Sequence, residues 1–69
     1  MQISARNQIK GVITDIKSGI VTAKVTLDIG GGNMISSVIT VDSIEELKLK
    51  VGDEVFAIIK STEVMIGKE

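Results

Sequence analysis

The residues best suited to chemistry lie near the two ends of the chain. Close to the C-terminus an apolar run ends in Lys60, and Ser61 and Thr62 follow it directly. A lysine ammonium is a pure hydrogen-bond donor, and each hydroxyl adds a donor that can rotate toward its partner. Near the N-terminus Ser4 and Arg6 are alternate residues, so an extended segment presents both on one face. Because all of these groups donate hydrogen bonds, the pattern predicts a site for an anion.

A second set of hydroxyls lies in the middle of the chain, at Thr40 and Ser43. The segment Ser43-Ile44-Glu45-Glu46 has the S-x-x-E form of a capping box, which predicts a short helix over about 44–48 with Ser43 as its N-cap. The free N–H groups at the start of a helix attract anions, and both hydroxyls would lie close to them. Ser43 cannot cap the helix and serve a ligand in full, so a plain capping role remains an alternative for it.

The two cationic residues also have alternative interpretations. An isolated arginine such as Arg6 is usually a surface charge. Lys60 comes at the end of an apolar run, where a charge needs a partner, and either an anion or the carboxylate of Glu63 would supply one.

The composition does not indicate an enzyme. His and Cys are both missing, so the usual pairs of nucleophile and base are missing too, and a serine alone is a weak nucleophile. The nine acidic residues are scattered and form no convergent pair. We therefore expect no catalytic residues, no metal ligated by protein side chains and no cofactor.

Size and composition predict one domain, residues 1–69, that needs partners. A chain of 69 residues is close to the lower limit for a self-sufficient core, and without Cys it cannot add disulfides. Hydrophobic residues make up 43% of the sequence, which is high for so small a monomer. Oligomerisation is the remaining way to stabilise the fold.

The sequence does not indicate binding to nucleic acids or to membranes. A net charge of -1 with one Phe and no Tyr or Trp gives neither the basic groove nor the stacking platforms of a nucleic-acid surface. No apolar run has the length of a membrane span, and no basic segment followed by an apolar stretch begins the chain. We expect a cytoplasmic protein that binds neither nucleic acid nor membranes.

The elements that position the donors are mainly strands. Apolar and polar residues alternate over 20–29, which is typical of a half-buried strand. The run 54–59 is apolar on both faces, which predicts a strand whose two faces are both covered. In so short a chain, we expect another subunit to cover the second face. Ser18-Gly19 predicts a turn, and Gly30–Asn33 a longer hairpin loop. The predicted strands are about 9–16, 20–29, 34–41, 54–59 and 64–66. Five strands with a helix between the third and fourth predict an all-β, OB-type Greek-key barrel.

The segments that carry the donors resemble a known family. They are Ile3-Ser4-Ala5-Arg6-Asn7 followed by Lys10-Gly11, a mid-chain Gly-Gly-Asn, Thr40-Val41-Asp42-Ser43, and Lys60-Ser61-Thr62-Glu63-Val64-Met65-Ile66. In this order they resemble the molbindins, small molybdate-binding Mop proteins whose domain also recurs in molybdate-responsive regulators and molybdate importer ATPases. The resemblance covers essentially the whole chain.

The resemblance implies an OB-type barrel in a hexamer, built as a trimer of dimers with strands exchanged between partners. It also implies a molybdate site between two subunits and a second class of oxyanion site near the threefold axes, to which no residues are assigned here. The first site would be contacted by Ser4, Arg6, Thr40, Ser43, Lys60 and Ser61, with Asn7 and Thr62 as possible additions.

Residues and resemblance together predict a homo-oligomer that stores molybdate, or tungstate, as cargo. A tetrahedral dianion without a proton is all acceptor, so its best host is a cavity made only of donors. The alternative is a non-catalytic oligomerisation module with generic anion binding, in which Arg6 and Lys60 form ordinary interface ion pairs.

Overall fold

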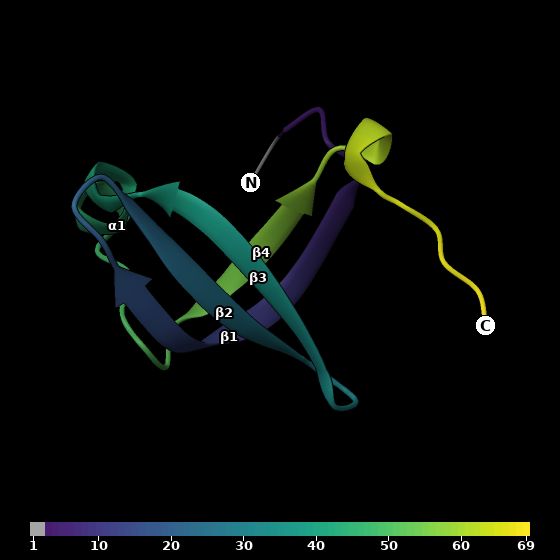
Figure 1. Ribbon diagram of the computed structural model, residues 1–69, viewed down its shortest axis with the longest axis horizontal. Helices are drawn as coiled ribbons and strands as arrows, with labels where there is room; N and C mark the ends of the chain where they lie inside the picture. The colour runs from purple at the N-terminus through teal and green to yellow at the C-terminus, as the bar shows by residue number, and fades with distance from the viewer. Residues whose placement is uncertain (1–2) are drawn as a thin grey trace.

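A computed structural model describes residues 3–69, which form a curled antiparallel sheet with a short helix at one end (Figure 1). The elements, in chain order, are β1 (Asn7–Ser18), β2 (Thr22–Gly30), β3 (Asn33–Thr40), α1 (Val41–Leu47), β4 (Glu54–Ile59) and the 3-10 turn η1 (Ser61–Glu63). The strand order is β3-β2-β1-β4, so β3 and β4 are the edges of the sheet. The prediction of an all-β domain with a helix between the third and fourth strands is confirmed.

The alternation of β2 fixes which face of the sheet is inside. Ala23, Val25 and Leu27 are buried, and Lys24 between them is exposed. Val25 and Leu27 pack with Ile13 of β1 to form the core cluster. The bounds of β1 to β4 differ from the predicted strands by two residues at most, because the side-chain period determines a strand well and its ends poorly.

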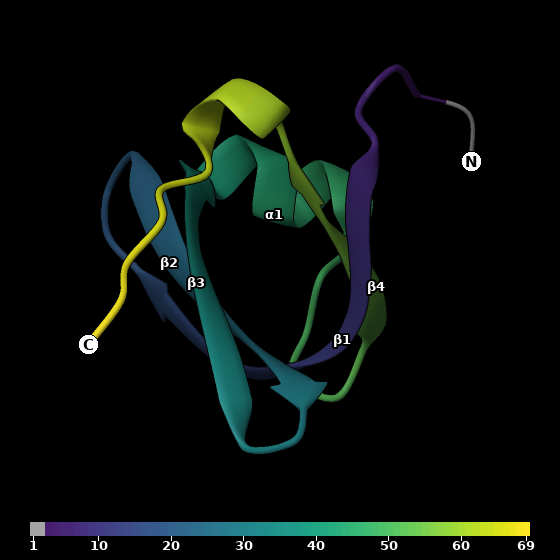
Figure 2. The ribbon, with the colours of Figure 1, turned by 90° about the vertical axis from the view of Figure 1, so that its right-hand side faces the viewer.

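The long strand β1 bends the sheet into a half-barrel (Figure 2). One half of β1 pairs with β2 and the other half pairs with β4. A register shift between Ile13 and Asp15 marks a bulge in the first ladder, and bulges increase the local bend and twist. Gly11 permits close packing at the bend, because a Cβ there would lie 3.0 Å from the Asp28 carbonyl oxygen.

The connection between β2 and β3 is tighter than predicted. Gly30 pairs directly with Asn33, so only Gly31 and Gly32 form the turn. Both have positive φ, 63° and 79°, which two-residue hairpin turns require and which glycine adopts without strain. The prediction of a longer loop over Gly30–Asn33 is therefore wrong.

Two further expectations are not met within one chain. Residues 64–66 follow η1 without forming a strand, so the sheet has four strands and the barrel stays open. The edge strand β4 is half-buried on one face only, while Phe56 and Ile58 are exposed. Its second cover, another subunit, remains a prediction. Within residues 3–69 no helix is long and apolar enough to cross a membrane.

Candidate functional site

One end of the half-barrel gathers the terminal donors. Asn7 begins β1 and pairs with Ile59 of β4, so the segment before β1 and the segment after β4 leave the sheet side by side. A shallow hollow of about 390 Å³ lies here, lined by Arg6 and Asn7 together with Gln8, Ile9, Ile59 and Val64. We call the donors of these two segments the cationic cluster, which consists of Ser4, Arg6, Asn7, Lys60, Ser61 and Thr62; of these, Arg6 and Asn7 line the hollow.

The charges of the cationic cluster face solvent. Arg6 and Lys60 are both exposed, and neither belongs to the two ion pairs that the described residues form. The Glu63 carboxylate forms no ion pair with the Lys60 ammonium. The Glu63 backbone N–H donates to the Lys60 carbonyl oxygen at 2.9 Å. Both cations are therefore available to an anion in this chain.

The hydroxyls of Thr40 and Ser43 meet where β3 passes into α1. Their oxygens are 2.8 Å apart, and the Ser43 N–H donates to the Thr40 hydroxyl oxygen at 3.0 Å. The bond between the hydroxyls uses one of their two protons, so one O–H remains to donate outward. We call Thr40 and Ser43 the hydroxyl pair.

The predicted N-cap is wrong. The helix begins at Val41 and its N-cap is Thr40, whose side chain accepts from the Ser43 N–H, whereas Ser43 lies inside the first turn. Thr40 is the last residue of β3 to pair with β2, opposite Thr22. The Val41 N–H still donates to the Val21 carbonyl oxygen, and the helix begins at Val41. The capping role thus belongs to Thr40, and the Ser43 hydroxyl is not needed for it.

The two donor groups lie at opposite ends of the molecule. β1 connects them: its Asn7 end adjoins the cationic cluster, and its Ser18 end pairs with Ala23, next to the Thr22–Thr40 pair. The strand has 12 residues and would span about 40 Å if straight. Figure 1 shows the same separation, with α1 at one end and η1 at the other. A single chain therefore does not bring the two groups to one ligand.

The tight turn before β4 is held by its own charges. Asp53 accepts from the Lys50 backbone N–H at 3.1 Å and forms an ion pair with the Lys50 ammonium at 2.9 Å. The hydrogen bond with the Lys50 side chain is the main reason that the pKa of Asp53 is lowered. The turn then pairs with β1, since Ile13 donates to the Asp53 carbonyl oxygen at 2.9 Å. Asp53 therefore has a structural role, remote from the cationic cluster.

Sequence reasoning missed two neighbours of the cationic cluster. The Gln8 side-chain amide donates to the Ala5 carbonyl oxygen at 3.0 Å and so ties down the segment that carries Arg6. Val64 lines the hollow beside Arg6. Gln8 could have been found from its alternation with Arg6, whereas the position of Val64 depends on the path of η1.

Comparison with known proteins decides the family. A model of the TOBE domain matches residues 3–66. The molybdenum-pterin-binding protein 1 of Clostridium pasteurianum is 58% identical over 66 residues, which cover 96% of this chain and 97% of that protein. The chain therefore belongs to the TOBE family, in its Mop group of molbindins.

Solved structures agree with this Mop-family assignment. MopII from Clostridium pasteurianum superimposes with a TM-score of 0.91 at 55% identity, covering 97% of this chain and all of that one. The cytoplasmic molybdate-binding protein ModG, solved with molybdate bound, gives a TM-score of 0.83 at 43% identity, over 88% of this chain and 43% of ModG. The fold and the family thus agree along nearly the whole chain.

Proposed function

We propose that this Mop-family chain forms a homo-oligomer that binds and stores molybdate, and that tungstate can replace it. The anion is held by charge and hydrogen bonds at subunit interfaces, without a bond from protein to metal and without catalysis. We place the protein in the cytoplasm, as in its relative ModG. The assembly we propose is a hexamer, a trimer of dimers, in which residues 64–66 become the fifth strand of an OB-type barrel.

The observation that carries this proposal is the separation of the two donor groups. Arg6 and Lys60 supply positive charge at one end of the chain, and the hydroxyl pair supplies donors at the other. In a symmetric pair of subunits the cationic cluster of one copy can face the hydroxyl pair of its partner, twice over. Each such site contains Ser4, Arg6, Lys60 and Ser61 from one copy with Thr40 and Ser43 from the other, and Asn7 and Thr62 close by.

The donor set fits a dianion without protons. Hydrogen bonds to charged groups contribute about 1.5–3 kcal/mol each, so the loss of one should weaken binding by about 10- to 150-fold. Phosphate is partly protonated at neutral pH, and its hydroxyl would face donors with nothing to accept its proton. Molybdate and tungstate should therefore bind far more tightly than phosphate.

A complementation experiment tests the shared site. Lys60→Ala damages the cationic cluster and Ser43→Ala damages the hydroxyl pair, so each variant alone should bind molybdate weakly at every site. If the two variants are unfolded together and refolded as an equal mixture, a mixed pair has one site with both changes and one with neither. We expect about a quarter of all sites to regain wild-type affinity by calorimetric titration.

The controls make the outcome decisive. Lys68→Ala removes an exposed lysine outside both groups and should bind as the wild type does. Recovery in the mixture supports the intersubunit site. Weak binding by both variants without recovery would assign both groups to one subunit, and wild-type binding by either variant would remove that residue from the site. Phosphate that displaces molybdate at equal concentration would indicate a generic anion surface.

A further inference from the structure

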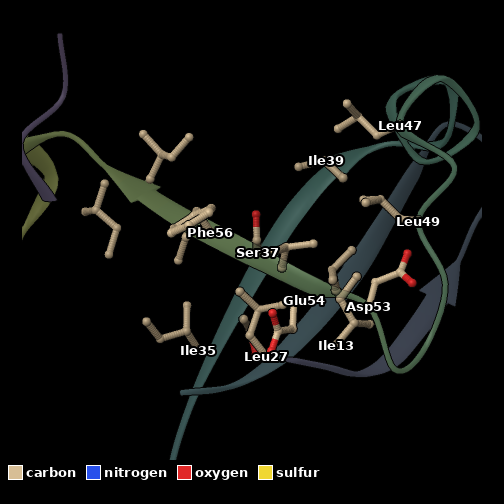
Figure 3. A pocket seen from close by; sticks show the side chains of 16 residues that line it. Ile13, Leu27, Ile35, Ser37, Ile39, Leu47, Leu49, Asp53, Glu54 and Phe56 are labelled. Carbon is tan, nitrogen blue, oxygen red and sulfur yellow. The ribbon is translucent and has the colours of Figure 1, made fainter. Parts of the chain in front are cut away.

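Two hollows in the described part of the chain differ in their chemistry. The larger one, of about 620 Å³, is a groove between the edge strands β3 and β4, and apolar side chains line most of it (Figure 3). Its charged lining residues, Asp53 and Glu54, are both acidic and would repel an anion. The smaller hollow is the one beside Arg6. It contains one further polar side chain, Gln8, that the proposed anion site does not use.

Gln8 holds the peptide group that joins Ala5 to Arg6. Its side-chain amide lies 3.0 Å from the Ala5 carbonyl oxygen. A carbonyl oxygen only accepts, so the amide nitrogen must face it and donate. The atoms of a peptide group are coplanar and include the Cα atoms on both sides. A bond to this carbonyl therefore orients the Arg6 N–H and fixes the position of the Arg6 Cα.

Arg6 consequently lies between two fixed points. The residue after it, Asn7, begins β1 and pairs with Ile59 in the ladder with β4. The peptide group before it is the one that Gln8 holds. Outside the sheet ladders, no other hydrogen bond within residues 3–69 reaches the segment 3–6. Without the Gln8 amide, the backbone of Arg6 would be held from one side only.

The second cation of the cationic cluster is held by different means. Lys60 precedes η1, and its carbonyl oxygen accepts from the Glu63 N–H at 2.9 Å, so the backbone of the turn fixes it. Arg6 lies at a bend before β1, where a side chain takes the place of that backbone bond. An amide suits this position, because it donates without carrying a charge that would compete for the anion or pair with the guanidinium.

We propose that Gln8 is a positioning residue for the anion: it fixes the backbone from which the Arg6 guanidinium reaches the ligand, and does not touch the ligand itself. The proposal rests on the function proposed above, in which Arg6 is a ligand of molybdate. A site that is formed in only a fraction of molecules loses affinity by that fraction. Because one such hydrogen bond shifts an equilibrium by about 2- to 12-fold, Gln8→Met should weaken molybdate binding by that factor.

A double-mutant cycle separates positioning from direct contact. Calorimetric titration with sodium molybdate compares the wild type, Gln8→Met, Arg6→Ala and the double variant, at a concentration where size-exclusion chromatography shows the same oligomer for all. If Gln8 acts through Arg6, Gln8→Met should change the affinity of the Arg6→Ala protein by less than about twofold. An equal loss in both backgrounds would mean that Gln8 contacts the anion or acts elsewhere, and would overturn the proposal.

Thr14→Val is the matched control. Thr14 is also an exposed residue of β1 whose side chain donates to a backbone carbonyl oxygen, that of Thr26 at 3.3 Å. The variant loses the same kind of bond at a distance from Arg6, so it should bind molybdate as the wild type does. A loss equal to that of Gln8→Met would show a general effect of weakening β1, which would contradict a specific role for Gln8.

A measurement without the anion completes the test. Nuclear magnetic resonance relaxation gives the order parameter of each backbone N–H, and that of Arg6 should fall in Gln8→Met while that of Asn7 in the ladder stays the same. An unchanged order parameter for Arg6 would overturn the proposal even if affinity fell. A wild type that binds molybdate no better than Gln8→Met would refute this proposal alone. A wild type that does not bind molybdate would refute the proposed function, and this proposal with it.

Discussion

Replacing Thr40 and Ser43 one at a time should separate the stability of α1 from the binding of the anion. Thr40→Val keeps the shape of the side chain but removes the oxygen that accepts from the Ser43 N–H at 3.0 Å. The loss of a threonine N-cap costs about 1 kcal/mol. For a domain of this size that corresponds to a decrease in melting temperature of about 4–8 °C. Ser43→Ala leaves the same N–H in place, so its effect on stability should stay within about 0.5 kcal/mol.

Molybdate binding should depend on Ser43 even though stability does not. Ser43→Ala removes a hydroxyl of the proposed site while the cap persists, so molybdate affinity should fall about tenfold or more with little change in melting temperature. Thr22→Val is the matched control, because Thr22 pairs with Thr40 across the sheet and makes no side-chain hydrogen bond among the described residues. Melting is followed by circular dichroism at one fixed protein concentration, and binding by calorimetry.

Two results would refute the reasoning. If Ser43→Ala lowered the melting temperature as much as Thr40→Val, the capping oxygen would belong to Ser43 after all. If Thr22→Val lowered the melting temperature as much as Thr40→Val, the cost would reflect the loss of any hydroxyl from this end of the β2–β3 ladder, and the cap would contribute nothing of its own.

Three further changes test the fold. Gly11→Ala should destabilise by about 1–3 kcal/mol, because its Cβ would approach the Asp28 carbonyl oxygen to 3.0 Å, whereas Gly67→Ala meets nothing within 4 Å; urea titration compares the two. Lys48 has φ of 53° at the end of α1, so Lys48→Gly should raise stability by about 1 kcal/mol, and an unchanged urea midpoint would contradict this. Hydrogen bonds with Lys50 lower the pKa of Asp53, so its contribution should be complete above about pH 4 and be lost as pH falls through the lower folded pKa. Acid titration of Asp53→Asn should therefore begin to lose stability less steeply than the wild type.

The strands could be predicted because their signal is local. Alternation of apolar and polar residues determines which face of β2 is buried, and no distant contact is needed to see it. The sequence places the helix start wrongly because Ser43-x-x-Glu46 has the full form of a capping box, whereas Thr40, the N-cap of the helix, has Ser43 and not Glu or Gln three residues later. The choice between them depends on where the β2–β3 ladder ends, at the Thr22–Thr40 pair, and that register is set by tertiary structure. Which hydroxyl caps the helix therefore depends on tertiary structure and not on the local sequence.

The predicted fifth strand has a different physical explanation. Val64 to Ile66 have the apolar character of a strand, and Met65 and Ile66 are more than 90% exposed in the single chain. A strand needs a neighbouring edge, and the two free edges of this sheet, β3 and β4, face one another across a groove that residues 64–66 of the same chain do not line. The sequence predicts the strand from its composition but carries no local signal of the edge with which it would pair.

The same reasoning applies to the candidate site. Residue types identified Arg6, Lys60 and the hydroxyl pair as donors, since charge and hydroxyl chemistry are properties of single residues. The distance between these donors is a property of the sheet: β1 runs from one group to the other, and its ladders with β2 and β4 fix them at opposite ends. A strand of 12 residues that is held in two ladders cannot fold back to bring its two ends to one small anion. If all these donors bind one anion, the second half of the site must come from another copy, so that any change that prevents pairing also removes the anion site.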